Sequence, residues 1–141
     1  MNKQVRFTTA LALGAAVLSI PALAIAQPTV DIVDPARLVA RGAGAIVSVT
    51  FTCDATAPTD QTSLSVNLTQ RVGNSTTNGS GFANGFNCTA TPQTIEVVVT
   101  SFNGRFKKSG SAIAQAFLSA CHPDFFFCES AQAAEEIQIR R

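Results

Sequence analysis

The sequence lacks several of the residues from which catalytic sites are usually built. Its 141 residues contain no tryptophan or tyrosine, one methionine and a single histidine, His122. Only 13% of the residues are charged, and ten phenylalanines supply all of the aromatic side chains. A lone histidine leaves little material for general acid–base catalysis or for a histidine-rich metal site. The composition therefore argues against an enzyme.

Residues 1–26 are typical of a secretory signal peptide. Lys3 and Arg6 precede a mostly apolar run over residues 10–20, and the small-x-small sequence Ala24-Ile25-Ala26 follows. Pro21 makes this run too short to span a bilayer, which needs about 20 apolar residues. We therefore predict cleavage after Ala26 and a mature chain of residues 27–141. That chain is expected to be secreted, either extracellular or in the cell envelope.

An excess of positive charge and a second long apolar run are both missing from the mature chain. The formal charge of +1 becomes −1 when Lys3 and Arg6 are removed. Arg105, Lys107 and Lys108 form one basic cluster, which favours a solvated turn. We predict no nucleic-acid partner, no membrane span and no cofactor. The length suits one domain, and we expect a monomer.

Alternation of apolar and polar residues predicts short β-strands along the mature chain. In the clearest strand, Val47, Val49 and Phe51 point to one side. The polar segment 73–81 is typical of a turn region, and Asn103-Gly104 predicts a hairpin turn. The expected strands cover residues 29–33 with 38–39, 45–53, 64–72, 94–101 and 135–140. Residues 81–88 are expected to form either a short, glycine-loosened strand or a pair of turns.

Residues 111–121 are ambiguous between strand and helix. As a strand, the segment places Ala112, Ala114 and Ala116 on one face, whereas a helix aligns Ile113 with Phe117. Alanine favours a helix locally. We predict a strand, because every clear neighbour is a strand.

These patterns predict an all-β fold, an antiparallel immunoglobulin-like Greek-key β-sandwich of about seven strands with two disulfides. Exported chains with an even number of cysteines usually pair them, and three pairings are formally possible. In Greek-key order the strand ending at Cys53 lies beside the strand beginning near Thr94, which favours Cys53–Cys88 and Cys121–Cys128. The missing tryptophan excludes an antibody-like core.

Three stretches carry a resemblance to known proteins: Ser48-Val-Thr-Phe-Thr-Cys53, Ser63-Leu-Ser-Val-Asn-Leu-Thr-Gln-Arg71 and Pro92-Gln-Thr-Ile-Glu-Val-Val-Val99. They resemble uncharacterised small secreted bacterial proteins over most of the mature chain. A weaker similarity is to neocarzinostatin-type apoproteins, secreted seven-strand sandwiches that carry a hydrophobic chromophore. That resemblance implies that Cys121–Cys128 is the bridge in the last hairpin loop.

The segment between Cys121 and Cys128 is the main candidate site. A nucleophile beside His122 would need a free thiol, and the spacing of Cys121, His122, Asp124 and Cys128 does not match a structural zinc site. We therefore predict neither catalytic nor metal-binding residues. This segment also contains Phe125, Phe126 and Phe127, which either cap the open end of the sandwich or contribute to binding.

We predict a secreted, non-enzymatic binding module that presents these phenylalanines to a protein or cell-surface partner. The alternative is a carrier of a small hydrophobic ligand, bound in a cleft between the last hairpin and Phe82 or Phe86.

Overall fold

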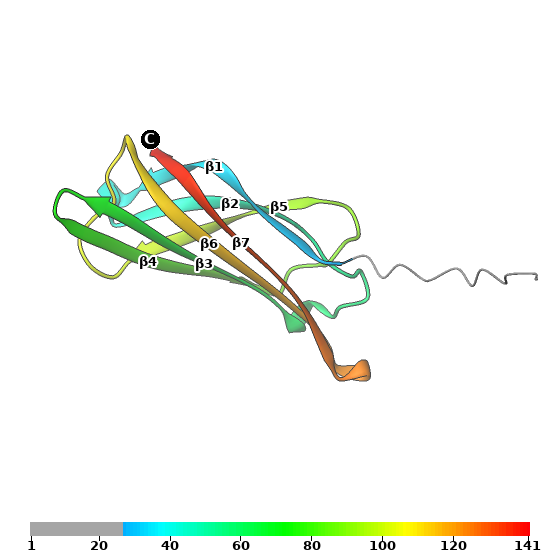
Figure 1. Ribbon diagram of the computed structural model, residues 1–141. Coiled ribbons are helices and arrows are strands. Elements are labelled where there is room, and N and C mark those ends of the chain that lie inside the picture. Colours follow the sequence, from blue (N-terminus) through cyan, green and yellow to red (C-terminus); the bar gives the residue numbers. More distant parts are fainter. Residues whose placement is uncertain (1–26) are drawn as a thin grey trace, which may run out of the picture.

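A computed structural model describes residues 27–141, apart from the side chain of Phe125. The predicted signal peptide lies outside the described residues. The described chain forms seven strands and three single-turn 3-10 helices (Figure 1), which confirms the all-β prediction. The strands are β1 (Thr29–Val39), β2 (Gly44–Thr52), β3 (Thr62–Val72), β4 (Ser75–Asn84), β5 (Gln93–Ser101), β6 (Gly110–His122) and β7 (Phe127–Arg140). The helical turns are η1 (Ala40–Gly42), η2 (Thr59–Gln61) and η3 (Pro123–Phe125).

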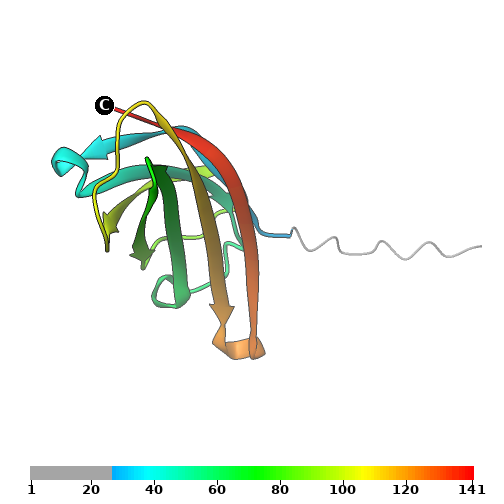
Figure 2. The ribbon, with the colours of Figure 1, turned by 60° about the vertical axis from the view of Figure 1, so that its left-hand side comes forward.

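The strands form one closed barrel in the order β1-β2-β5-β4-β3-β6-β7. Long antiparallel ladders join β1 to β2, β2 to β5, β4 to β3, β3 to β6 and β6 to β7. The two remaining junctions are short, because β4 pairs with β5 at two positions and β1 pairs with β7, in parallel, at two. The sequence predicted two stacked sheets, whereas these short seams close the sheet on itself (Figure 2).

Alternation explains which side chains form the core. The apolar rows of β2 and β3 point inward, as the sequence predicts, and Phe51, Leu64 and Leu68 are fully buried. Segment 110–122 is a strand, with its alanine row buried and Phe117 exposed. Hydrogen bonding to both β3 and β7 thus outweighs the local preference of alanine for a helix.

Three sequence predictions about strands and turns are wrong. Strand β4 already begins at Ser75, inside the expected turn region, and β7 begins at Phe127 instead of near residue 135. Asn103-Gly104 does not join a hairpin, because β5 pairs with β2 and β4 while β6 pairs with β3 and β7. The connection from β5 therefore crosses the end of the barrel.

Both predicted disulfides are present, Cys53–Cys88 and Cys121–Cys128. Antiparallel pairing of β2 with β5, Thr50 opposite Thr94, brings the first two cysteines together as predicted. Cys121 and Cys128 are direct partners in the β6–β7 ladder. Both bridges lie at the same end of the barrel. No helix within residues 27–141 has the length and apolar character needed to cross a membrane.

Candidate functional site

The β6–β7 hairpin ends in a tip, residues 121–128, that extends beyond the neighbouring strands (orange in Figures 1 and 2). The disulfide joins the two strands directly below the last residue pair, His122 and Phe127. The turn itself is η3, closed by a hydrogen bond of 3.4 Å from the Phe126 N–H to the Pro123 carbonyl. Phe126 has a left-handed backbone (φ 53°), and its side chain is 96% exposed. The turn therefore displays Phe126 to solvent.

His122 faces the barrel and is 3% exposed. Its ring stacks on Phe127, with centroids 4.8 Å apart, and its Nδ1 lies 3.4 Å from the Thr56 hydroxyl oxygen. Its Nε2 is buried and has no hydrogen-bond partner among the described residues. The histidine therefore helps to fix the hairpin against the loop that follows Cys53, and Phe127, 47% exposed, covers it.

That loop makes one further contact with the hairpin and is itself held by internal hydrogen bonds. The Asp54 backbone N–H donates to Glu129 Oε1 at 2.7 Å, which ties β7 to the end of β2. The Asp54 carboxylate accepts hydrogen bonds from the Thr56 backbone N–H and hydroxyl, both at 2.9 Å. These two bonds, and then the charge of nearby His122, lower the pKa of Asp54, although burial acts in the opposite direction. The tip consequently rests on a firmly held loop.

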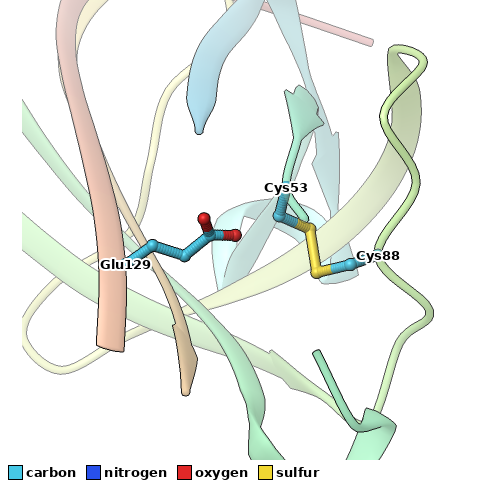
Figure 3. Close-up of side chains that lie close together, drawn as sticks. All are labelled: Cys53, Cys88 and Glu129. Carbon is cyan, nitrogen blue, oxygen red and sulfur yellow. A yellow bond between two sulfur atoms is a disulfide. The ribbon is translucent and has the colours of Figure 1, made fainter. Parts of the chain in front are cut away.

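Glu129 is the residue of this site that sequence reasoning did not identify. Figure 3 shows its carboxylate pointing toward the Cys53–Cys88 bridge. The carboxylate oxygen and the two sulfur atoms lie within 4.8 Å of one another, a spacing that metal ligands could share. Metal binding requires thiolates, however, and both sulfurs are joined in a disulfide. The carboxylate instead accepts the Asp54 N–H, a long-range contact for which a single sequence carries no signal.

The other two predicted binding residues do not lie at the tip. Phe86 is half-buried and packs edge-on against the core residue Phe51, with ring centroids 4.9 Å apart. Phe82 is 69% exposed on the outer face of β4 and pairs with Ser65, which pairs with Phe117 on its other side. His122 lies five residues beyond Phe117 along β6, about 17 Å at the usual rise of a strand. The structure therefore keeps Phe82 away from the tip, and it packs Phe86 on the core instead of displaying it. Phe125 ends η3, and its side chain is not described.

Three of the hollows in the surface of residues 27–141 have volumes of about 420, 430 and 280 Å³. The first lies on the outer face of β3, β6 and β7 beside Phe117, and the third lies near the start of β6. The second lies at the barrel end opposite the disulfides. None of the three is lined by Phe82, Phe86 or the tip phenylalanines.

Comparison of the chain with models of known protein families, with curated proteins and with solved structures found no match.

Proposed function

We propose that the protein is a non-catalytic binding module that inserts Phe126 into an apolar pocket of a protein or cell-surface partner. The observation that carries this proposal is the 96% exposure of Phe126 on a disulfide-bridged tip. An exposed phenylalanine forgoes about 1.5–3 kcal/mol of burial free energy, which a partner's pocket would recover. The bridge and the contacts of His122 and Glu129 hold the tip in place, so that binding would cost little conformational entropy.

The cysteines support a function without catalysis. All four are joined in disulfides, and no free thiol remains in residues 27–141. A nucleophilic cysteine paired with His122 would require one. The buried ring of His122 is engaged by Phe127 and Thr56 on the side of the hairpin that faces the barrel.

We also propose that the barrel is a flattened Greek-key domain of immunoglobulin type that acts outside the cytoplasm. Long ladders join β1, β2 and β5 in one group and β4, β3, β6 and β7 in another, and the two groups meet only at short seams. Two disulfides suit an oxidising compartment. The resemblance of the sequence to small secreted bacterial proteins is consistent with this proposal. The alternative, a carrier of a small hydrophobic ligand, rests on the resemblance to neocarzinostatin-type apoproteins.

Photo-crosslinking tests the proposal. A benzoyl-phenylalanine placed at position 126 should give one discrete crosslinked product on cells of the producing organism. The same probe at position 102 is the matched control, because Phe102 is 71% exposed at the other end of the barrel. Unlabelled wild-type protein and Phe102→Ser should suppress the product, whereas Phe126→Ser should not. Equal competition by Phe126→Ser would refute the proposal.

Thermal unfolding separates binding from capping at the same tip. Phe126→Ser should leave Tm within about 1 °C of the wild type, because so little of its side chain is buried. Phe127→Ser should lose about 1 kcal/mol, the usual value of an aromatic pair, because it removes the stack on His122. A large stability loss in Phe126→Ser would instead mean that this residue caps the barrel.

A further inference from the structure

Every lysine and arginine of residues 27–141 lies in the half of the barrel opposite the two disulfides. Six of them converge at its end from three parts of the chain that are distant in sequence: Arg41; Arg105, Lys107 and Lys108; Arg140 and Arg141. In Figure 1 this end carries the C label, and the orange tip lies at the other end. The sequence by itself shows only the run from Arg105 to Lys108 as a cluster.

Backbone hydrogen bonds hold these segments together. The Phe106 N–H donates to the Gly42 carbonyl and the Ser109 N–H to the Ile139 carbonyl, both at 2.8 Å. The buried amide of Gln70 binds the backbone of Lys107 on both sides, accepting from its N–H at 2.7 Å and donating to its carbonyl at 2.9 Å. The loop that carries Lys107 is therefore clamped between η1 and β7.

The turn η1 has an unusual backbone. Ala40, Arg41 and Gly42 all have positive φ angles, of 49°, 54° and 93°. Left-handed residues other than glycine are uncommon and are strained. A Cβ at Gly42 would collide with the Phe106 carbonyl oxygen, so this turn packs directly on the clamped loop.

A groove of about 430 Å³ lies beside this contact and is lined by residues of β1, η1, the loop and Arg141. The half-buried side chains of Leu38 and Val39 line its apolar side, while Arg41, Lys107, Lys108 and Arg141 line its charged side. No aspartate or glutamate side chain lines it. The one ion pair among the described residues joins Arg37 to Glu96 at 3.4 Å, outside the groove. No acidic side chain in the lining offsets these four cations, so the groove favours an anion.

We propose that this groove binds an amphiphilic anion, an apolar chain that ends in a phosphate or carboxylate group. The apolar side would take the chain and the basic side chains would take the head group. An apolar wall does not suit a free inorganic anion. Phe106 is 1% exposed and cannot stack on the bases of a nucleic acid. Lipid bound at this end would leave the hairpin tip pointing away from it.

Binding to a fluorescent dodecyl phosphate below its micelle concentration tests the groove. Lys107→Gln with Lys108→Gln should weaken binding about 25-fold, from a factor of about five for each basic residue near an anionic head group. The matched control, Arg37→Gln with Arg71→Gln, also removes two charges from this half but changes no residue that lines the groove. It should weaken binding less than about threefold. An equal loss of affinity in the two double variants would overturn the proposal, because it would show that net charge alone attracts the ligand.

A second variant tests the apolar side. Val39→Ser should weaken binding of dodecyl phosphate several-fold and leave binding of inorganic phosphate unchanged. If inorganic phosphate competes as well as dodecyl phosphate does, the apolar wall contributes nothing and the proposal fails. Absence of binding to both dodecyl phosphate and anionic vesicles would overturn it equally.

Vesicles distinguish the two sources of such a ligand. Co-sedimentation with phosphatidylglycerol vesicles, but not with phosphatidylcholine vesicles, would support the proposal with a membrane lipid as ligand. Binding to dodecyl phosphate alone would support it with a free amphiphile. In either case Phe126→Ser should bind as the wild type does, because the tip lies at the opposite end.

Discussion

Replacement of Gly81 by alanine tests the closure of the barrel between β4 and β5. An added Cβ at Gly81 would collide with the Val98 carbonyl oxygen and would lie 2.9 Å from Val97 Cγ1. At Gly79, a Cβ would lie 2.5 Å from the Thr100 carbonyl oxygen. Only two residue pairs join these strands. A side chain at Gly81 must therefore push β4 away from β5 where the seam is weakest.

Overpacking of this kind costs about 1–3 kcal/mol. We expect about 3 kcal/mol for Gly81→Ala, because the obstacle is a backbone carbonyl that cannot rotate away. For a domain of this size, that loss lowers Tm by about 12 °C, at about 4 °C for each kcal/mol. Gly73→Ala is the control. Gly73 has a φ of +61°, a left-handed conformation that costs alanine about 1 kcal/mol. A Cβ added at Gly73 would meet no atom within 4 Å.

Thermal and urea unfolding with both disulfides intact measure the two variants. Gly81→Ala should be the more damaging of the two, although Gly73 has the conformation that favours glycine. If Gly81→Ala costs no more than Gly73→Ala, β4 does not approach β5 closely, and the sheet is open at this seam.

Two further predictions concern the bridges and the pH dependence of stability. Replacing Cys53 and Cys88 by serine should lower the free energy of unfolding in urea by about 4 kcal/mol, and replacing Cys121 and Cys128 should lower it by about 2.5 kcal/mol. The first bridge contributes more because it closes the longer loop. The reverse order would mean that the hairpin bridge contributes more to stability than the long bridge does. Desolvation, then a hydrogen bond and repulsion from neighbouring aspartates, raises the pKa of Glu135 above its ordinary value of 4.5. The folded state then binds this proton more tightly than the unfolded state, so stability falls as the pH rises from the ordinary pKa to the raised one. Glu135→Gln should therefore raise Tm at pH 7 but not below about pH 4, and an equal effect at both pH values would contradict this cause.

Local patterns were reliable where one face of a strand is buried. Alternation correctly predicted the inward rows of β2 and β3, and Cys53 and Cys88 met as the expected strand order required. Patterns failed where the strand carries no apolar alternation. Strand β4 has glycines and polar residues because β5 approaches its backbone, and the sequence alone reads these as a turn. The dipeptide Asn103-Gly104 lies in a bend of the chain, but its flanking strands pair elsewhere.

The candidate site was predicted in part. The bridge between Cys121 and Cys128 and the phenylalanines between them were evident in the sequence, because their spacing is local. Which phenylalanine is displayed could not be read from it, since that depends on the left-handed turn at Phe126. The contact of Glu129 with Asp54 joins residues that are distant in sequence, and no local pattern signals it.

The sequence by itself determined the class of fold, the strand character of most segments and the even set of cysteines, because strand periodicity and composition act over a few residues. Only the tertiary structure decided the closure of the sheet, the display of Phe126 and the gathering of six basic residues at one end. Arg41, Lys107 and Arg141 stand far apart along the chain, and only barrel closure makes them neighbours. Their charges come together because backbone hydrogen bonds between distant segments fix the ends of the strands.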